Sequence, residues 1–415
     1  MTVPTVEAFI NFSTGAIFGG DLFLNTGQLN INTLSGPTLV VDVSNLLDSI
    51  TTNRGRNAQA DQFQTGSLSM RLIDQNGNFN PQNVNSPYYG LLSPMRKVTI
   101  SANYDNVDYP IFAGFITSFT TTTPKNALDV VYTTITAVDG FRLAANAQIS
   151  TVAGATAGNL SGTRISQILD AIAWPATQRD IDAGLTTMQA DPGTARTSLA
   201  AMQTVEISEY GASYISASGD FTFQDRALTS SSIGSTPTVF ADDGTGIEYS
   251  SAKWVLNDNL VYNDASITAT GLATQTASDA TSIATYFTHS YKQTDLLMDS
   301  TTAAKNYALA YVASRKDTSI RCDSVTLKDL NTPGYTTGVA AALGLDYFDT
   351  ITVKSTQPAA TGTSTLNKTL QIFGVAMSIS PSKWRVTFTT LESIIDGLIL
   401  DNAIYGLLDT GVLSY

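Results

Sequence analysis

Few residues in this sequence are of types that could carry out covalent chemistry. His289 is the only histidine, so any Ser–His–Asp triad would have to be built around it. No Gly-x-Ser-x-Gly nucleophile elbow is present, and a lone histidine in the aromatic stretch 286–291 is typical of a structural side chain. Cys322 could act as a thiolate, but its place in an apparent strand favours a small core residue. The sequence therefore predicts a protein that is not an enzyme.

Two acidic turns could hold a cation. Asp74, Asn76 and Asn78 place oxygen atoms at alternate positions around a glycine, as calcium loops do, but the glutamate that completes such loops is missing. The Asp-Asp-Gly stretch at 242–244 is a common turn sequence. Phosphate-binding, zinc-helix and dinucleotide motifs are also missing. We expect plain turns at both places, no metal and no cofactor.

Composition narrows the classes of partner. The net charge of −13 does not provide the basic surface that nucleic-acid binding requires, and it disfavours anionic membranes. No apolar run approaches the ~20 residues of a membrane span, and no basic segment precedes an apolar one as in a signal peptide. A single cysteine excludes intrachain disulfides. Charged residues make up only 14% of the chain, which favours a surface covered by other proteins.

The elements that must position any site are mainly strands. Leu68, Met70 and Leu72 alternate with polar residues, the two-residue period of a half-buried strand. A turn at 103–106 and a strand at 109–119 follow, and Gly114 within that strand indicates a bulge or bend. The pattern predicts a small barrel or a strongly curled sheet.

Helical periodicity is found in the middle of the chain. Residues 163–172 and 194–205 are expected to form helices, followed by a hairpin at 212–226 whose Phe221 and Phe223 pack on them. A third helix over 301–316 would bury one face, made of Ala304, Tyr307, Ala308, Tyr311 and Val312. Further strands are predicted at 324–327, 350–353, 369–379 and 383–389.

The β pattern occurs twice. Residues 97–119 and 130–141 show a strand, a turn, an Ile-Phe strand with a nearby glycine, and a threonine-rich strand. Residues 349–380 and 383–393 show the same features in the same order. This internal repeat predicts a duplicated barrel.

Several segments resemble the minor tail proteins of long-tailed, siphovirus-like bacteriophages. The resemblance is carried by LIDQNGNFNPQ at 72–82, SPYYGLLSPMRKV at 86–98 and IFAGFITSF at 111–119. Asn53-Arg-Gly-Arg and Asp139-Gly-Phe-Arg142 also match, and Asp139 could either pair with Arg142 or cap the turn. The asparagine after Leu-Asp is shifted here, and Met95 replaces a common glycine. The resemblance extends over nearly the whole chain.

This resemblance implies a baseplate or tail-tip hub in the virion, at the distal end of the tail, made in the host cytoplasm. Such hubs are homotrimeric rings with two barrel-like β domains and smaller α/β domains in a mostly β chain. Three copies then present six like modules to a six-fold tail tube. The implied partners are distal tail or tube proteins, the tape measure protein, and tip or fibre proteins, with DNA only transiently in the lumen and no stable membrane insertion.

The expected domains lie in chain order. They are 1–145 (N-terminal strands and first barrel), 146–240 (helix-helix-hairpin), 241–320 (second α/β domain), 321–390 (second barrel) and 391–415 (helix and apolar tail). The tail should contact a partner, and its candidate interaction residues are Ile404, Tyr405, Leu407, Leu408, Leu413 and Tyr415.

Two other functions stay open at this point. One is a tail-associated hydrolase of bacterial cell walls, which would depend on His289. The other is a receptor-binding tail protein with a carbohydrate groove. The short segment after the second barrel argues against both, because added functions in this family usually come as extensions.

Overall fold

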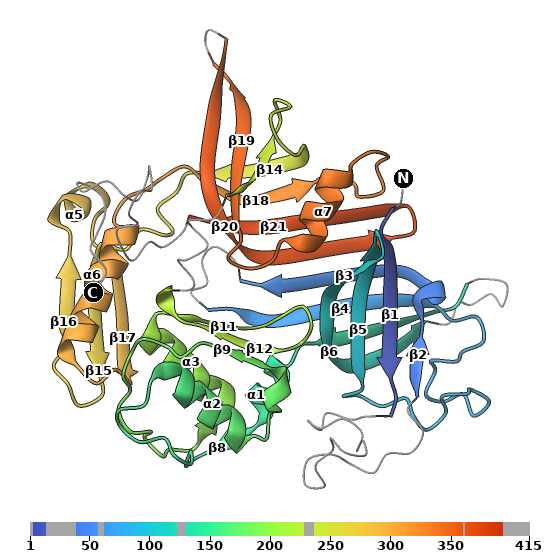
Figure 1. Ribbon diagram of the computed structural model, residues 1–415, viewed down its shortest axis with the longest axis horizontal. Helices are drawn as coiled ribbons and strands as arrows, with labels where there is room; N and C mark the ends of the chain where they lie inside the picture. The colour runs from blue at the N-terminus through green and yellow to red at the C-terminus, as the bar shows by residue number, and fades with distance from the viewer. Residues whose placement is uncertain are drawn as a thin grey trace.

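The computed structural model describes residues 3–13, 39–56, 62–122, 130–227, 236–359 and 362–392. Strands dominate, and one large antiparallel sheet extends through the molecule with a helical part below it and a smaller unit to one side (Figure 1). The predicted mostly β architecture with α/β parts is confirmed. In the described residues, no helix is long and apolar enough to cross a membrane.

The first β region is built from alternating apolar residues. Its elements are β1 (Thr5–Asn11), β2 (Val40–Asp42), the short 3-10 helix Ser44–Leu46, β3 (Leu47–Gly55), β4 (Gln64–Ile73), β5 (Lys97–Tyr104), β6 (Val107–Thr122) and β7 (Tyr132–Val138). Leu68, Met70 and Leu72 on β4 are buried as predicted. Asp105 and Asn106 adopt positive φ in the β5–β6 turn, which confirms the predicted tight hairpin.

The second β region lies at the other end of the chain. Its elements are β13 (Thr238–Ala241), β14 (Tyr249–Val255), β18 (Arg321–Leu327), α7 (Thr336–Gly344), β19 (Thr350–Pro358), β20 (Thr363–Ser380) and β21 (Lys383–Leu391). The two regions have the same strand order. The first runs β3-β4-β7-β6-β5 and the second β14-β18-β21-β20-β19, with every neighbouring pair antiparallel. This order supports the predicted internal repeat, and we call each set of five strands a module.

The repeat extends to irregularities of the backbone. The longest strand of each module changes its pairing partner halfway along its length. This change occurs at Phe115 in β6 and at Gln371 in β20. Two residues beyond this point, each strand has a bulge against the last strand of its module, at Thr117 in β6 and at Phe373 in β20. A bulge at the same place in both modules is strong evidence for duplication, because bulges depend on the local fit of strands.

Gly114 has a different role from the one predicted. The bulge lies at Thr117, whereas a Cβ atom on Gly114 would stand 2.3 Å from the carbonyl oxygen of Val138. The glycine therefore permits the close approach of β7 to β6 at the point where β6 changes partners.

The expectation of barrels is not met in the described strands. They belong to one 13-stranded sheet in which β3 of the first module pairs with β20 of the second, and β19 with β13 branches off at β20. Periodicity and glycines locate strands and bends, but they do not specify which strand the edge of a module will meet. This is why the sequence suggested separate, closed units.

The α/β part follows β7. It contains α1 (Phe141–Asn146), β8 (Gln148–Ile149), α2 (Ser161–Ala171), a 3-10 turn at Ala176–Gln178, β9 (Arg179–Ile181), β10 (Arg196–Thr197), α3 (Ser198–Glu209), β11 (Ala212–Ile215) and β12 (Phe221–Gln224). Phe221 and Phe223 are fully buried, as predicted. The helix α3 begins later than expected, because β10 pairs with β8 and the Thr197 side chain then caps the helix.

A smaller unit is inserted between β14 and β18. Its elements are β15 (Asp264–Ala269), β16 (Gln275–Ser278), α5 (Ala280–Tyr286), β17 (Ser290–Leu296) and α6 (Thr301–Arg315). The buried face of α6 contains the five residues predicted from the sequence, and the Tyr311 ring stacks on Tyr291 at a centroid distance of 3.7 Å. This unit has its own hydrophobic core.

Candidate functional site

The candidate catalytic residues are not assembled into a catalytic site. The described hydrogen bond of the His289 ring joins its Nε2 to the backbone carbonyl of Tyr286, at 3.1 Å. Cys322 is fully buried, and burial raises the pKa of its thiol to about 11, so it stays protonated at neutral pH. The His289 ring thus contacts the backbone, and the Cys322 side chain belongs to the core.

In both acidic turns, an aspartate carboxylate accepts hydrogen bonds from backbone N–H groups. The Asp74 carboxylate accepts hydrogen bonds from the backbone N–H of Asn78 and Phe79 and from the Thr133 hydroxyl. Asp242 accepts two bonds from the Thr356 N–H and one from its hydroxyl, which fixes β13 to β19. Within the described residues, no group of three His, Cys, Asp or Glu side chains could hold a metal ion. In both turns these contacts fix the backbone, and the expectation that neither turn binds a cation stays a prediction.

Asp139 caps a turn. Its carboxylate accepts hydrogen bonds from the N–H of Gly66 at 2.5 Å and of Phe141 at 3.0 Å, which ties the end of β7 to β4 and begins α1. Burial raises the pKa of Asp139 to about 7 despite these bonds and the nearby Arg54. Of the two roles considered, the structure supports the cap.

The two modules are connected by a pairing between one strand of each. Residues 50–55 of β3 pair antiparallel with residues 374–379 of β20. Gly55 has a φ of +107°, and a Cβ atom there would stand 2.3 Å from the Phe373 carbonyl oxygen. Only glycine fits this backbone. We call this pairing of β3 with β20 the joint.

Two arginines flank that glycine. Arg54 is almost completely buried, forms an ion pair with Asp346 at 3.1 Å, and lies over the Tyr347 ring. Arg56 donates its backbone N–H to Phe373 and lies over the ring of the same residue. The sequence marked this Arg-Gly-Arg element only as a resemblance. Its role was missed because the partner strand lies about 320 positions later.

The repeat provides a second place where the modules could pair as they do at the joint, but the described strands are not paired there. In the repeat, β14 corresponds to β3, and residues 118–122 of β6 correspond to the part of β20 that pairs with β3. Among those strands, β14 pairs with β18 alone, and this part of β6 pairs with β7 alone. Among the described strands, one chain therefore makes one joint and leaves two complementary strand edges unpaired, which we call the open edges.

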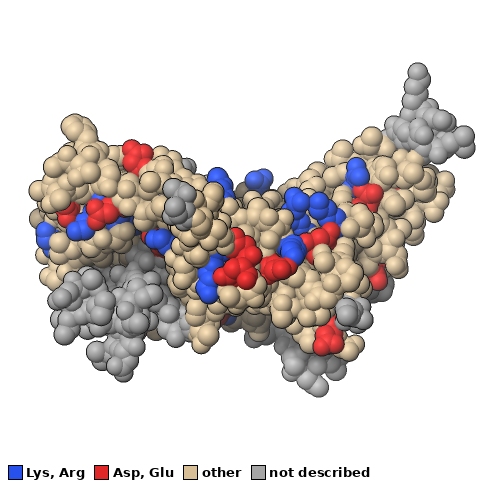
Figure 2. All heavy atoms as spheres, turned by 90° about the horizontal axis from the view of Figure 1, so that it is seen from above, with Lys and Arg blue, Asp and Glu red and all other residues tan. Residues whose placement is uncertain are grey.

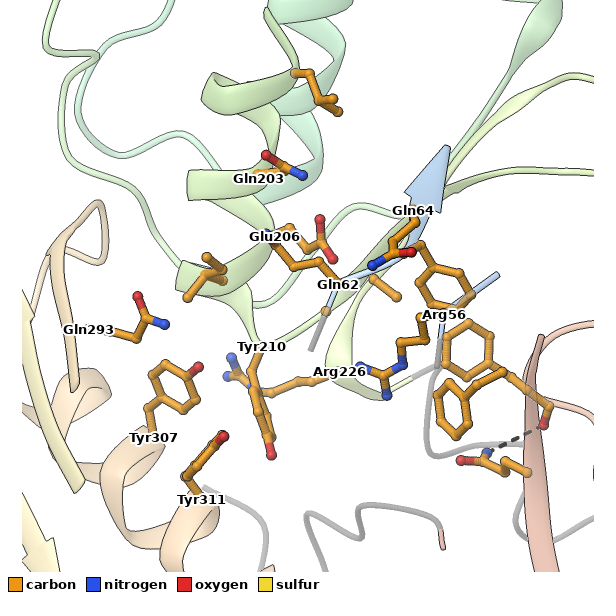
Figure 3. A pocket seen from close by; sticks show the side chains of 18 of the residues that line it. Arg56, Gln62, Gln64, Gln203, Glu206, Tyr210, Arg226, Gln293, Tyr307 and Tyr311 are labelled. Atoms are coloured by element: carbon orange, nitrogen blue, oxygen red, sulfur yellow. Dashed lines mark hydrogen bonds between the residues drawn. The ribbon is translucent and has the colours of Figure 1, made fainter. Parts of the chain in front are cut away.

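A cavity of about 530 Å³ lies where the modules, the α/β part and the inserted unit meet (Figure 3). Among its described lining residues are three arginines, Arg56, Arg226 and Arg315, and several aromatic side chains, over which Arg56 and Arg315 lie. In Figure 3, Tyr307 and Tyr311 of α6 face Tyr210 at the end of α3. The cavity lining was not predicted, since it combines residues from four separate parts of the sequence.

Glu206 on α3 also lines the cavity, and burial raises its pKa to about 8, although Ser213 and Arg56 favour the charged form. The unfolded glutamate ionises near pH 4.5. A raised pKa in the folded state means that the stabilisation is complete below pH 4.5 and is lost as pH rises through 8.

We therefore expect Glu206→Gln to become more stable relative to the unmodified chain as pH increases. The difference in unfolding free energy should change by roughly 4 kcal/mol between pH 5 and pH 9 in urea titrations. Asp170→Asn, at a largely exposed acid on α2, serves as the control and should leave the difference flat. A flat difference for Glu206→Gln would contradict the prediction.

Charge does not accumulate with a single sign on the face seen in Figure 2, where acidic and basic side chains lie next to one another in the central region. The candidate interaction residues of the tail (Ile404, Tyr405, Leu407, Leu408, Leu413 and Tyr415) lie outside the described residues.

Comparison with known proteins relates the fold to viral tails. No protein-family model matches the sequence, and no curated protein matches it. A solved tail protein from Neisseria meningitidis MC58 aligns over 94% of this chain and 97% of its own length, with a TM-score of 0.55 and 11% identity. The 43 kDa tail protein of prophage MuSo2 from Shewanella oneidensis aligns over 86% and 96%, with a TM-score of 0.51 and 10% identity. The chain thus has the fold of these tail proteins.

Proposed function

We propose that this chain is a structural, non-enzymatic component of a phage tail, of the tail-tip or baseplate hub type, which works as a homotrimeric ring. The observation that carries the proposal is the repeated module. Within the described strands, β3 and β20 form the joint, whereas the equivalent edges, those of β14 and of residues 118–122 of β6, are the unpaired open edges. Exposed strand edges readily pair with other chains, so natural proteins usually cover them. A second copy of this chain presents the complementary edge.

The contact between copies would reproduce the joint. β14 of one copy would pair with residues 118–122 of β6 in the next copy, as β3 pairs with β20 within the chain. Such a head-to-tail contact forms a closed ring when its rotation is suitable. Three copies would give a ring of six similar modules, which fits the six-fold tail tube that the family resemblance implies.

The repeat also gives the register of this contact. Counting from the position where each long strand changes partner, Thr122 of β6 corresponds to Ser378 of β20. On the other edge, Lys253 of β14 corresponds to Thr51 of β3. Ser378 lies opposite Thr51 within the chain. Thr122 is therefore expected to lie opposite Lys253 of the neighbouring copy.

The remaining parts of the proposal follow from this position in a tail. The ring would lie at the distal end, between tube or distal-tail proteins with the tape measure protein above and tip or fibre proteins below, and DNA would pass through it. The five domains expected from the sequence would be the building blocks of each subunit. The repeat implies that the second β domain also includes β14, which precedes the inserted unit.

The test is a cysteine pair across the proposed contact. The variant Thr122→Cys/Lys253→Cys should give covalent trimers on mild oxidation, because opposed residues of antiparallel strands lie within disulfide reach. Both side chains are exposed in the single chain, and the native Cys322 is buried. Non-reducing electrophoresis and light scattering measure the outcome.

The two single-cysteine variants are the matched controls, and neither should yield a covalent trimer. A trimer that fails to crosslink would disprove the proposed register and leave the hub function standing. A chain that remains monomeric at high concentration would disprove the ring itself.

A further inference from the structure

The cavity lies beside the point where the last described strand ends. Leu391, at the end of β21, pairs with Gln371, and Gln371 lines the cavity together with Phe373. Glu392 is fixed at this place by the Ser319 hydroxyl and the Lys368 ammonium group, at 2.9 and 2.7 Å. Whatever follows Glu392 therefore starts at the rim of the cavity.

We propose that residues 393–415 of the same chain bind in this cavity and thereby tie together the four parts of the chain that line it. The sequence SIIDGLILDNAIYGLLDTGVLSY is rich in apolar residues, which need to be covered. Its start at the rim favours the same chain, because no linker has to be crossed.

The charges of residues 393–415 and of the cavity lining are complementary. The segment has three aspartates, Asp396, Asp401 and Asp409, and no lysine or arginine. Three arginines are among the described residues that line the cavity, and one of them, Arg226, already pairs with Glu209. The one carboxyl group among the described lining residues, that of Glu206, is held largely neutral at pH 7 by burial. An acidic, apolar peptide is thus the chemistry that this lining favours.

The size and lining of the cavity define what can enter. A volume of about 530 Å³ falls in the ~300–1,000 Å³ range of small-ligand sites, so it accommodates a few side chains and not the whole segment. Tyr210, Tyr291, Tyr307 and Tyr311 give it rigid aromatic walls, suited to Leu, Ile or Tyr side chains.

The experiment is site-specific photocrosslinking in the full-length protein. A benzophenone amino acid is placed at Gln293, which lines the cavity from β17, and in a control at Tyr89, which is exposed on the loop between β4 and β5. Arg385 is the last basic residue, so trypsin releases the whole segment in a single peptide, 386–415. We expect this peptide to be crosslinked at least ten times more from position 293 than from position 89.

Two further measurements determine which copy of the chain supplies the segment bound in the cavity and whether Arg315 contributes to its binding. Equal amounts of ¹⁵N-labelled and unlabelled protein are assembled together and illuminated, and crosslinked products should contain a single isotope. Mixed-isotope products would show that the neighbouring copy supplies the segment, and a probe at 293 that captures only other peptides or solvent would show that the segment binds elsewhere. Either result overturns the proposal. Arg315→Glu should lower the yield at least threefold, whereas Arg315→Lys should retain most of it.

Discussion

Replacing Gly55 with alanine is expected to destabilise the chain by more than about 3 kcal/mol and to separate β3 from β20. Two costs add at this position. The φ of +107° is unfavourable for any residue with a side chain, and the new methyl carbon would lie 2.3 Å from a backbone oxygen that cannot move independently. Because the joint is the place where the modules share a sheet, the strain acts on the connection between them.

A matched control separates these two costs. Gly271 also has a positive φ, +71°, but a Cβ atom there would meet nothing within 4 Å. Gly271→Ala should therefore cost only about 1 kcal/mol. Urea unfolding gives the two free energies, and hydrogen exchange of the β3 amides shows whether the joint opens. Equal losses in the two variants would mean that the close contact at Gly55 does not matter.

Strands, helices and turns could be predicted where they depend on the types and spacing of neighbouring residues. The alternation on β4 and the apolar face of α6 result from the two-residue and 3.6-residue periods, and the structure buries the same residues that the sequence indicated. The tight turn at Asp105 and Asn106 follows from residue types that tolerate positive φ. Even the repeat was visible, because both modules use similar strands in the same order.

What could not be predicted depends on contacts between distant segments. The sequence suggested two separate barrels because nothing in residues 50–55 specifies pairing with 374–379. The Arg-Gly-Arg element was noticed, but its reason, the close approach to Phe373, needs the partner strand. The same holds for the cavity, where each tyrosine of α6 looked like an ordinary core residue until the surrounding elements were in place.

The second large effect concerns Glu209, the last residue of α3, which is fully buried. Its carboxylate accepts hydrogen bonds from the Ser161 hydroxyl at 2.8 Å and from the backbone N–H of Thr186 at 2.7 Å, and it forms an ion pair with Arg226 at 3.5 Å. It thereby connects α2, the segment before β10 and the end of β12. Glu209→Ala is expected to destabilise the α/β part by about 3–5 kcal/mol, since a partly buried cation and several donors, among them the buried Ser161 hydroxyl, lose their acceptor.

An ion pair with an exposed carboxylate provides the comparison. Asp170 on α2 lies 2.8 Å from Arg179, but its side chain is 69% exposed, so Asp170→Ala should cost under about 0.5 kcal/mol. Thermal unfolding of both variants would test this contrast, and similar shifts in the midpoint would refute it. If the α/β part unfolds separately from the sheet in Glu209→Ala, the Thr122→Cys/Lys253→Cys crosslink should still form. The open edges belong to the modules, and their pairing does not involve Glu209.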